Sequence, residues 1–198
     1  QLSGSTDAAF AFAVIGDTFH GEQAFVGVLG GQIHTDPSHP LYVGVTKPTS
    51  GSAELTGIIW SLAWFLQSPY LWMRLPLTIY YDSDYAAGIA HKHYAPSQHT
   101  AAAHLAATLA EIVSMYVHVE WCHTKSHQGH QWNELVDSAA TCFSTHTDHP
   151  SACLDNLIHQ PTPICAAAHD PTFCQWIGTL LASQNDEFTQ HSLPPILP

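Results

Sequence analysis

Apolar residues open the chain in two β-rich runs and later recur at helical spacing. Residues 8–16 and 23–33 are rich in Ala, Phe, Val and Ile and flank the polar stretch DTFHGE, which predicts an antiparallel hairpin. The short run LYVGV (41–45) predicts a third strand. Residues 53–67 then space Leu, Ile and Phe three or four positions apart, and TSGS (49–52) supplies capping hydroxyls, so we expect a helix there.

The next segments alternate between strand and helix patterns. LTIYYD (77–82) and VHVEW (117–121) predict strands, while residues 68–76 predict a loop. Helices are expected in DYAAGIAH and in two further segments, 98–115 and 133–143. An antiparallel start followed by alternating strands and helices is typical of an α/β domain with a mixed sheet and helices on its faces.

A change of composition after about residue 145 predicts the domain boundary. The chain beyond it is rich in His, Pro, Thr and Cys, with one further apolar segment, 172–183, that predicts a helix. We therefore expect one domain over 1–145 and a linker or tail over 146–198.

The charge balance is strongly acidic. Sixteen Asp and Glu residues face four Lys and Arg, giving a net charge of −12 with histidine neutral. Proteins that bind nucleic acid usually concentrate Lys and Arg, so a nucleic-acid partner has to be reconciled with this deficit. The 16 histidines can supply positive charge below about pH 6.5.

Cysteine spacing and hydropathy exclude some classes of protein. The five cysteines contain no C-x-x-C pair, which argues against a zinc ribbon and a complete disulfide framework and favours a reducing compartment. No apolar run is long enough to span a bilayer. We expect a soluble, intracellular protein with no membrane partner. Its first residue, Gln1, favours a piece of a longer protein.

Three carboxylates occur in otherwise apolar segments: Glu54, Asp82 and Asp137. Each has a local structural explanation, because Glu54 or Asp82 would serve as helix caps and Asp137 would pair with Asn133 on a helix surface. Together they suggest a different role. Ligands gather at the carboxyl ends of strands, where Asp82 lies, and oxygen ligands select Mg²⁺ or Mn²⁺.

Three motifs resemble segments of ribonuclease H domains. TSGSAELTGIIWSL resembles their glutamate-bearing helix, and LTIYYDSDYAAGI resembles their strand-Asp-Ser-x-Tyr-helix segment. VEWCHTKSHQGHQWNELVDSAA resembles their closing segment and is the most specific of the three. The resemblance covers about residues 40–143. Its details, WNELVD and TDPSHPLYVGV, are similar to ribonuclease H domains of non-LTR retroelement polyproteins, which also carry reverse transcriptase.

The resemblance implies a fold and an activity. The fold would be ribonuclease H-like, with a mixed sheet covered by helices on both faces. Two Mg²⁺ ions, with Mn²⁺ as an alternative, would be held by Glu54, Asp82 and Asp137 for cleavage of the RNA strand of RNA–DNA hybrids. The resemblance assigns His127 to proton shuttling or product release and places Ser83 and Asn133 near the substrate. Neighbouring domains of a polyprotein would be further partners.

The first aspartate of the family has two candidate positions. Asp17 fills this position if residues 8–16 are the first strand, but Thr18 and Phe19 are unusual followers. Alternatively, residues 8–16 are already the second strand, and the aspartate lies upstream of Gln1. We favour the second arrangement, in which this piece alone would be nearly inactive.

Two rival interpretations remain open. His123, His127 and His130, with Cys122, could form a metal-binding histidine module, although zinc sites usually show paired cysteines or H-x-x-x-H on a helix. We expect instead that His123 and His130 are surface residues. The second rival is a ribonuclease H-like scaffold without catalytic activity, which the acidic surface and the uncertain first aspartate favour.

Overall fold

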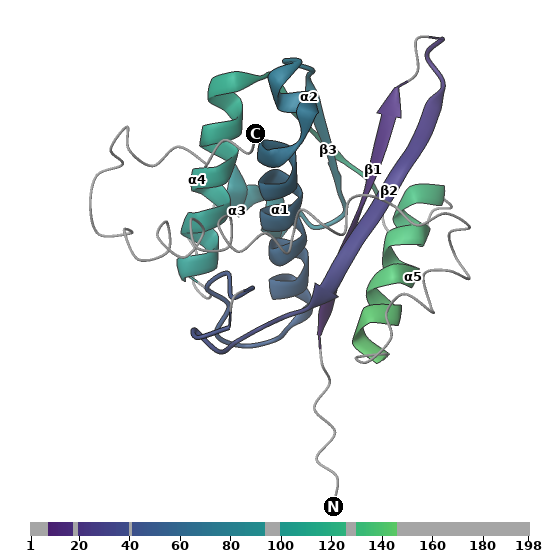
Figure 1. Ribbon diagram of the computed structural model, residues 1–198. Helices are drawn as coiled ribbons and strands as arrows, with labels where there is room; N and C mark the ends of the chain where they lie inside the picture. The colour runs from purple at the N-terminus through teal and green to yellow at the C-terminus, as the bar shows by residue number, and fades with distance from the viewer. Residues whose placement is uncertain (1–7, 18–19, 40, 94–99, 126–129, 146–198) are drawn as a thin grey trace, which may run out of the picture.

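The computed structural model describes residues 8–17, 20–39, 41–93, 100–125 and 130–145. Figure 1 shows a mixed α/β arrangement of these residues, which confirms the predicted class. In chain order the elements are β1 (Ala9–Asp17), β2 (Gln23–Gln32), α1 (Ser50–Gln67), α2 (Pro69–Trp72), β3 (Leu77–Tyr81), α3 (Asp84–Ala90), α4 (Thr100–Tyr116), β4 (Val119–His123) and α5 (Gln131–Thr145).

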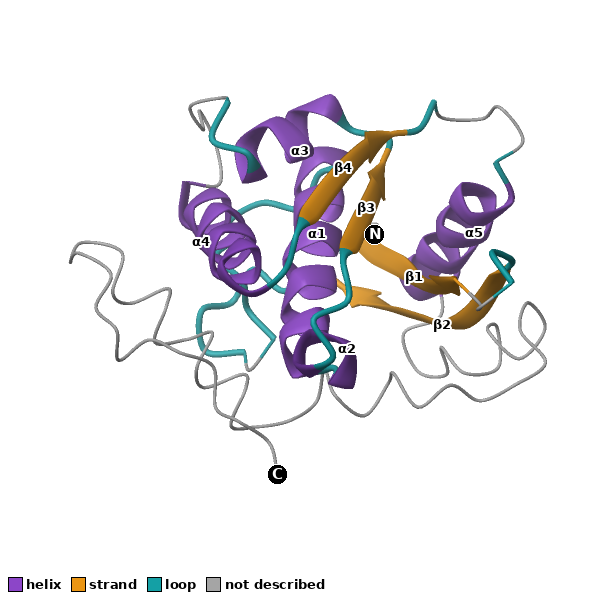
Figure 2. Cartoon of the chain, turned by 90° about the horizontal axis from the view of Figure 1, so that it is seen from above, coloured by secondary structure: helices purple, strands orange, loops and turns teal. Residues whose placement is uncertain are grey.

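The four described strands form two separate pairs. β1 pairs with β2 in an antiparallel ladder, with a register shift between Val14 and Ile15. β3 pairs with β4 in a parallel ladder from Leu77–Val119 to Tyr81–His123. Figure 2 shows the order β4, β3, β1, β2 across the molecule. The strand directions follow the prediction, but the expected single mixed sheet is divided between β1 and β3.

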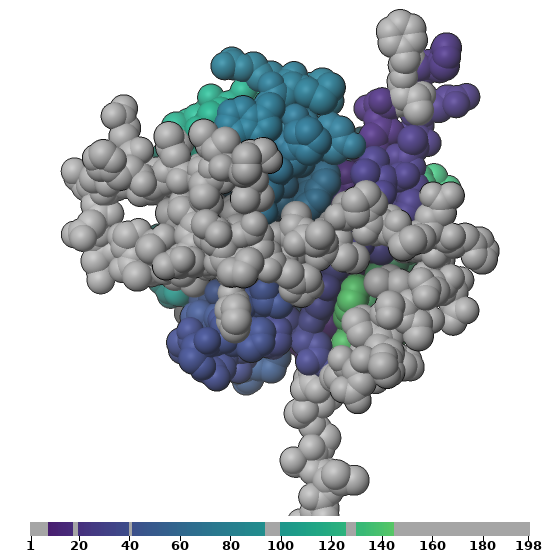
Figure 3. All heavy atoms as spheres, viewed as in Figure 1, coloured from purple at the N-terminus to yellow at the C-terminus, as the bar shows by residue number. Residues whose placement is uncertain are grey.

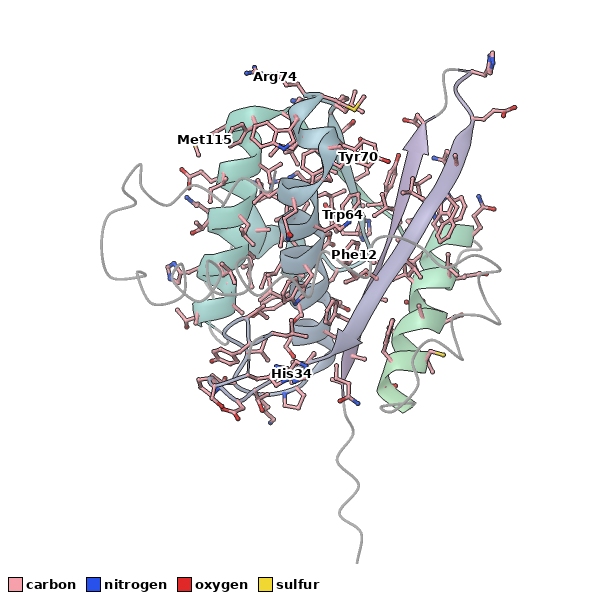
Figure 4. All side chains as sticks on the ribbon, in the orientation of Figure 1. Phe12, His34, Trp64, Tyr70, Arg74 and Met115 are labelled. Atoms are coloured by element: carbon pink, nitrogen blue, oxygen red, sulfur yellow. The ribbon has the colours of Figure 1, made fainter. Side chains whose placement is uncertain are left out.

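Helices lie on both faces of the β1–β2 pair. Phe10 and Phe12 of β1 belong to the main core with α1 and α4, and Figure 4 shows Phe12 between β1 and α1. On the opposite face, Ala9 and Val28 pack against Phe143 of α5. The alternation of β1 therefore buries successive side chains in two different cores, as the period of a strand requires.

The segment 41–45 is not a strand, contrary to the sequence prediction. Val43 and Val45 are 2% and 0% exposed, but they enter the core from an irregular loop. Gly44 has φ +88, and a Cβ at this position would lie 2.7 Å from the backbone nitrogen of Ala102 on α4. The alternating pattern of residues 41–45 therefore arises from two buried valines on either side of Gly44. The backbone at Gly44 lies so close to α4 that only glycine fits there.

The connection after α1 also differs from its prediction. Residues 69–72 form the short helix α2 where a loop was expected, because Pro69 is compatible with the first helical position. Around it, large apolar side chains are exposed: Trp72 by 58%, Met73 by 63% and Met115 by 62%. Figure 3 shows the α2 region at the surface, and Figure 4 places Arg74 and Met115 at the same end of the molecule.

Two further sequence predictions concern parts of the chain that the structure does not describe. The tail assigned to 146–198 and its expected helix at 172–183 lie outside the described residues. Among the helices that are described, none has the length and apolar character needed to cross a bilayer.

Candidate carboxylate site

Glu54 lies on α1 but does not cap it. The helix begins after Thr49, whose hydroxyl accepts a hydrogen bond from the Ser52 backbone N–H at 3.1 Å. The Ser52 hydroxyl accepts one in return from the Thr49 backbone N–H at 2.8 Å, completing a capping box. No acidic residue lies in the first turn of α1. The local explanation of Glu54 as a helix cap is therefore wrong.

Asp82 follows the last residue of β3 and does not cap the next helix. The N-cap of α3 is Ser83, whose hydroxyl accepts a hydrogen bond from the Ala86 backbone N–H at 3.3 Å. The acidic residue in the first turn of α3 is Asp84. The half-buried Asp82 is thus left at the carboxyl end of a strand without a capping role.

The Glu54 carboxyl group on α1 is influenced by acidic residues that follow β3 and that lie on α5. Its side chain is exposed by surface area, yet enough protein surrounds the carboxyl group that desolvation is the largest cause of a raised pKa. A hydrogen bond with the Ser83 side chain acts in the opposite direction on the pKa of Glu54. The negative charges of Asp82 and Asp137 raise it further. Asp82 and Asp137 therefore both lie within electrostatic range of Glu54.

Asp137 reaches this region from the face opposite to α1. Its helix, α5, is seated on the β1–β2 pair by Phe143, whose ring lies over Gly30 so closely that a Cβ there would be 2.5 Å from it. At the other end of α5, the Trp132 indole N–H donates to Gln23 Oε1 at 2.9 Å, and its ring stacks on Phe25. These contacts place Asp137, which is half-buried, in the middle of a helix held at both ends.

Asn133, one turn before Asp137, carries an unsatisfied donor. Its side-chain Nδ2 is buried and has no hydrogen-bond partner among the described residues. Leaving a buried amide donor unpaired costs about 1–3 kcal/mol, so such a group usually has a functional or ligand-related reason.

Asp17 does not join the three carboxylates. α1 approaches β1 at Gly57, where an added Cβ would lie 3.5 Å from the Ala11 carbonyl oxygen. Figure 1 shows α1 and β1 running in the same direction. Along the sequence, Glu54 comes one turn before Gly57, whereas Asp17 is the last residue of β1. Six residues of strand separate Ala11 from Asp17, which corresponds to about 20 Å. Of the two candidate positions for the family's first aspartate, this geometry disfavours Asp17.

The start of the histidine-rich loop is fixed beside the end of β3. The Thr124 backbone N–H and hydroxyl both donate to the Tyr81 carbonyl oxygen, at 2.7 Å and 3.1 Å. One residue earlier, His123 Nε2 lies 3.7 Å from Asp84 Oδ1. The structure therefore joins the two sequence motifs, although Thr124 was not among the predicted residues and its hydroxyl gives no distinctive sequence signal.

The histidines of this loop do not form a metal-binding cluster among the described residues. His123 and His130 are both exposed, as predicted, and His130 has its nearest aromatic contact with Tyr80, at 6.2 Å between ring centroids. His127 lies outside the described residues. Of the two described cysteines, Cys122 is free and Cys142 is disulfide-bonded.

The donor chemistry of Glu54, Asp82 and Asp137 fits a hard divalent cation, since carboxylate oxygens are the ligands that Mg²⁺ and Mn²⁺ prefer. Their packing is more open than a complete coordination sphere. In the part of the chain that the structure describes, no three His, Cys, Asp or Glu side chains are grouped closely enough to hold one ion. In the arrangement described here, Glu54, Asp82 and Asp137 therefore do not by themselves form a binding site for one ion.

The interpretation of the site depends on its own geometry, because comparisons with known proteins found no match. No family model matches the chain, and no match is found among curated proteins or among solved structures.

Proposed function

We propose that this domain is a divalent-metal-dependent endonuclease that cleaves the RNA strand of RNA–DNA hybrids, with a ribonuclease H-like fold. The observation that carries the proposal is the position of Glu54. The negative charges of Asp82 and Asp137 both raise the pKa of Glu54, so the end of β3 and helix α5 each bring a carboxylate within electrostatic range of the one on α1. The resemblance of the three motifs to ribonuclease H domains supports the same function.

Each residue of the site has a role that follows from its chemistry. Glu54, Asp82 and Asp137 would hold two Mg²⁺ ions, with Mn²⁺ as an alternative, and their mutual repulsion favours cation binding. Bound there, the ions would supply Lewis-acid stabilisation of the phosphodiester oxygens. Asn133 is proposed, from the motif resemblance, as a substrate contact. His127 is proposed, from its motif alone, as a proton carrier.

The break between the two strand pairs suggests how the site is completed. Neither β1 nor β3 has a described strand on the edge that faces the other. We propose that a further strand, preceding β1 in the parent protein, pairs between them and supplies the fourth carboxylate. This matches the second arrangement predicted from the sequence and is consistent with the distant position of Asp17.

A cleavage assay with a labelled RNA–DNA hybrid tests the proposal. The chain as given and the chain extended at its amino terminus are compared with Mg²⁺, and RNA and DNA duplexes serve as substrate controls. We expect metal-dependent cleavage of the RNA strand by the extended chain and little by the given chain. Hybrid cleavage that is insensitive to Asp82→Asn would overturn the catalytic assignment.

A catalytically inactive scaffold is the second candidate function. It is favoured by the net charge of −12 and by the ion pair of Lys92, one of only four basic residues, with Glu111 at 2.8 Å. Such a domain would contribute an interaction surface to neighbouring domains of a polyprotein. Absence of cleavage in both forms of the chain, despite native folding, would favour this alternative.

A further inference from the structure

Large apolar side chains gather on the surface where the chain leaves α2. Trp72, Met73 and Leu75 follow one another there, and all three are exposed. Figure 4 places Met115, the exposed methionine of α4, at the same end of the molecule as Arg74. Together these five residues form the α2 tip. Large apolar side chains that gather at one exposed place, rather than singly, are typical of an interaction surface.

The backbone of the α2 tip is fixed by packing and hydrogen bonds. The Arg74 N–H donates to the Leu71 carbonyl oxygen at 3.0 Å, and the Leu75 N–H donates to the Tyr70 carbonyl oxygen at 3.2 Å. These two bonds form a Schellman motif, which ends a helix. Beneath them Leu71 is buried, and the Tyr70 ring lies 6.0 Å from the Trp64 ring of α1 between centroids. The exposed side chains therefore project from a defined backbone.

Arg74 occupies the position of this motif that favours glycine. Its φ is +53, in the left-handed region, where a side chain costs conformational energy. Residues held in such conformations often serve a function. Among the residues that the structure describes, the Arg74 guanidinium has no ion pair and no hydrogen bond. The described fold therefore gains no electrostatic contact in return for this conformation.

The charge of Arg74 indicates the chemistry of a partner. It is one of only four Lys and Arg residues in a chain of net charge −12. Nucleic acid is bound by clusters of cations, and an anionic lipid surface or a second copy of the chain would be repelled by the net charge. A protein surface with a carboxylate among apolar groups complements both the guanidinium and its neighbours. Trp, Met and Arg are also the residues enriched where proteins bind each other.

We propose that the α2 tip is a docking surface for another protein, through an apolar segment of that protein that carries an Asp or Glu opposite Arg74. Trp72 supplies the apolar anchor, and the ion pair with Arg74 sets the orientation. The surface follows the C-terminal end of α1, whereas Glu54 lies near the start of that helix, about 20 Å away along its axis. The inference is therefore independent of the proposed nuclease function.

Selection of peptides on the full chain tests this surface. The probe is a displayed library of random dodecapeptides, and the enriched peptides are synthesised and titrated by fluorescence anisotropy. We expect them to combine large apolar residues with Asp or Glu, and to bind the Trp72→Ala chain at least about tenfold more weakly. Enriched peptides without acidic residues, or no enrichment relative to the Trp72→Ala chain, would overturn the proposal.

A matched pair of glycine variants separates the role of the cation from any effect on folding. Arg74→Gly and Lys92→Gly each remove an exposed cation from a residue with positive φ, so both should raise the midpoint of thermal unfolding by about 2–4 °C. Only Arg74→Gly should weaken peptide binding, by at least about tenfold. Equal peptide affinities of the two variants would refute the role of Arg74.

A charge exchange tests the predicted ion pair directly. Arg74→Glu should abolish binding of the acidic peptide and permit binding of a peptide in which Lys replaces the acidic residue. Failure of the exchanged pair to bind better than either single change would contradict the assignment of a carboxylate opposite Arg74.

Two further measurements identify the other possible occupants of the α2 tip. Sedimentation equilibrium detects association of two copies of the chain, and cosedimentation with phosphatidylcholine–phosphatidylserine vesicles detects lipid binding. We expect neither to depend on Trp72. Dimerisation or vesicle binding that is lost in Trp72→Ala would assign the tip to a second copy or to lipid and would overturn the proposal. None of these measurements involves hybrid cleavage, so their outcome is separate from that of the proposed function.

Discussion

Asp17 and Asp82 both mark the end of a strand, but they belong to different parts of the molecule. Asp17 closes β1 at the hairpin end, opposite Gln23 of β2, and is exposed. Asp82 follows β3, is half-buried, and lies close enough to Glu54 to raise the pKa of that carboxyl group. The difference arises from the direction of the two strands relative to α1.

This comparison shows that the local position of an acidic residue does not determine its role. A strand-end aspartate becomes part of a ligand site only where the strand ends beside other functional groups. At the end of β3, the start of α3 and the segment after β4 converge, and Thr124 fixes their spacing through two hydrogen bonds to the Tyr81 carbonyl oxygen.

The largest expected effect is on hybrid cleavage. In a form of the chain that cleaves the hybrid, Asp82→Asn should reduce kcat by at least about 100-fold, because loss of a metal ligand removes several kcal/mol of transition-state stabilisation. Asp17→Asn should change kcat by less than about twofold, because Asp17 lies away from the three carboxylates. Equal losses for the two variants would contradict the distinction between the two aspartates.

The packing of α5 against the β1–β2 pair can be tested by measuring protein stability. Gly30→Val should lower the free energy of unfolding by about 1–3 kcal/mol, because its Cβ would meet the Phe10 carbonyl oxygen and the Phe143 ring. Gly31→Ala is the matched control, since the nearest atom to its Cβ is a Phe10 ring carbon at 3.7 Å. Urea unfolding followed by circular dichroism measures both, and a Gly30 variant as stable as the control would show that α5 is not seated by this contact.

The end of α3 offers a change that should strengthen the fold without altering the carboxylates. Lys92 has φ +61, in the region that favours glycine, and ends the helix with hydrogen bonds from its own N–H to Ile89 and from the His93 N–H to Gly88. Lys92→Gly should therefore stabilise the protein by about 1 kcal/mol, with little cost from the exposed ion pair to Glu111. Thermal unfolding measures the gain, while unchanged Mn²⁺ affinity would show that the site depends on its charges rather than on global stability.

The smallest effect concerns the titration of Glu54. Asp82→Asn should lower the raised pKa of Glu54 by removing a like charge, whereas Asp17→Asn should leave the pKa of Glu54 unchanged. Carboxyl carbon NMR measures both. A lower Glu54 pKa in the Asp17 variant would place that aspartate near the site.

The same raised pKa of Glu54 sets the sign of its effect on stability. A carboxyl group with a folded pKa above its unfolded value favours the folded state at pH below the unfolded value. This contribution is lost as pH rises through the folded pKa. Glu54→Gln should therefore reduce the decline in unfolding free energy across that window, which pH-dependent urea unfolding would show.

The sequence predicted most local elements but not how they pair. Regular spacing of Leu55, Ile59 and Leu62 was sufficient to predict α1, and each of these residues is fully buried. The alternation of apolar residues around Gly44 led to the wrong prediction of a strand, because two valines buried from a loop give the same sequence pattern as a strand. The separation of the two strand pairs and the bonding of Thr124 to the Tyr81 carbonyl oxygen depend on long-range packing, which no local pattern encodes.

The carboxylates were partly predictable for a similar reason. Acidic residues in apolar segments identified Glu54, Asp82 and Asp137 as unusual, and the motif resemblance supplied a shared role. The choice between Asp17 and an upstream aspartate required the relative direction of β1 and α1, which is a property of the tertiary structure.

The unpaired inner edges of β1 and β3 also have a consequence for the behaviour of the protein in solution. A strand edge without a partner presents backbone N–H and C=O groups that a strand from another molecule can bind. The two described pairs face each other with such edges. At high concentration the chain should therefore self-associate by strand addition, which light scattering at increasing protein concentration would show.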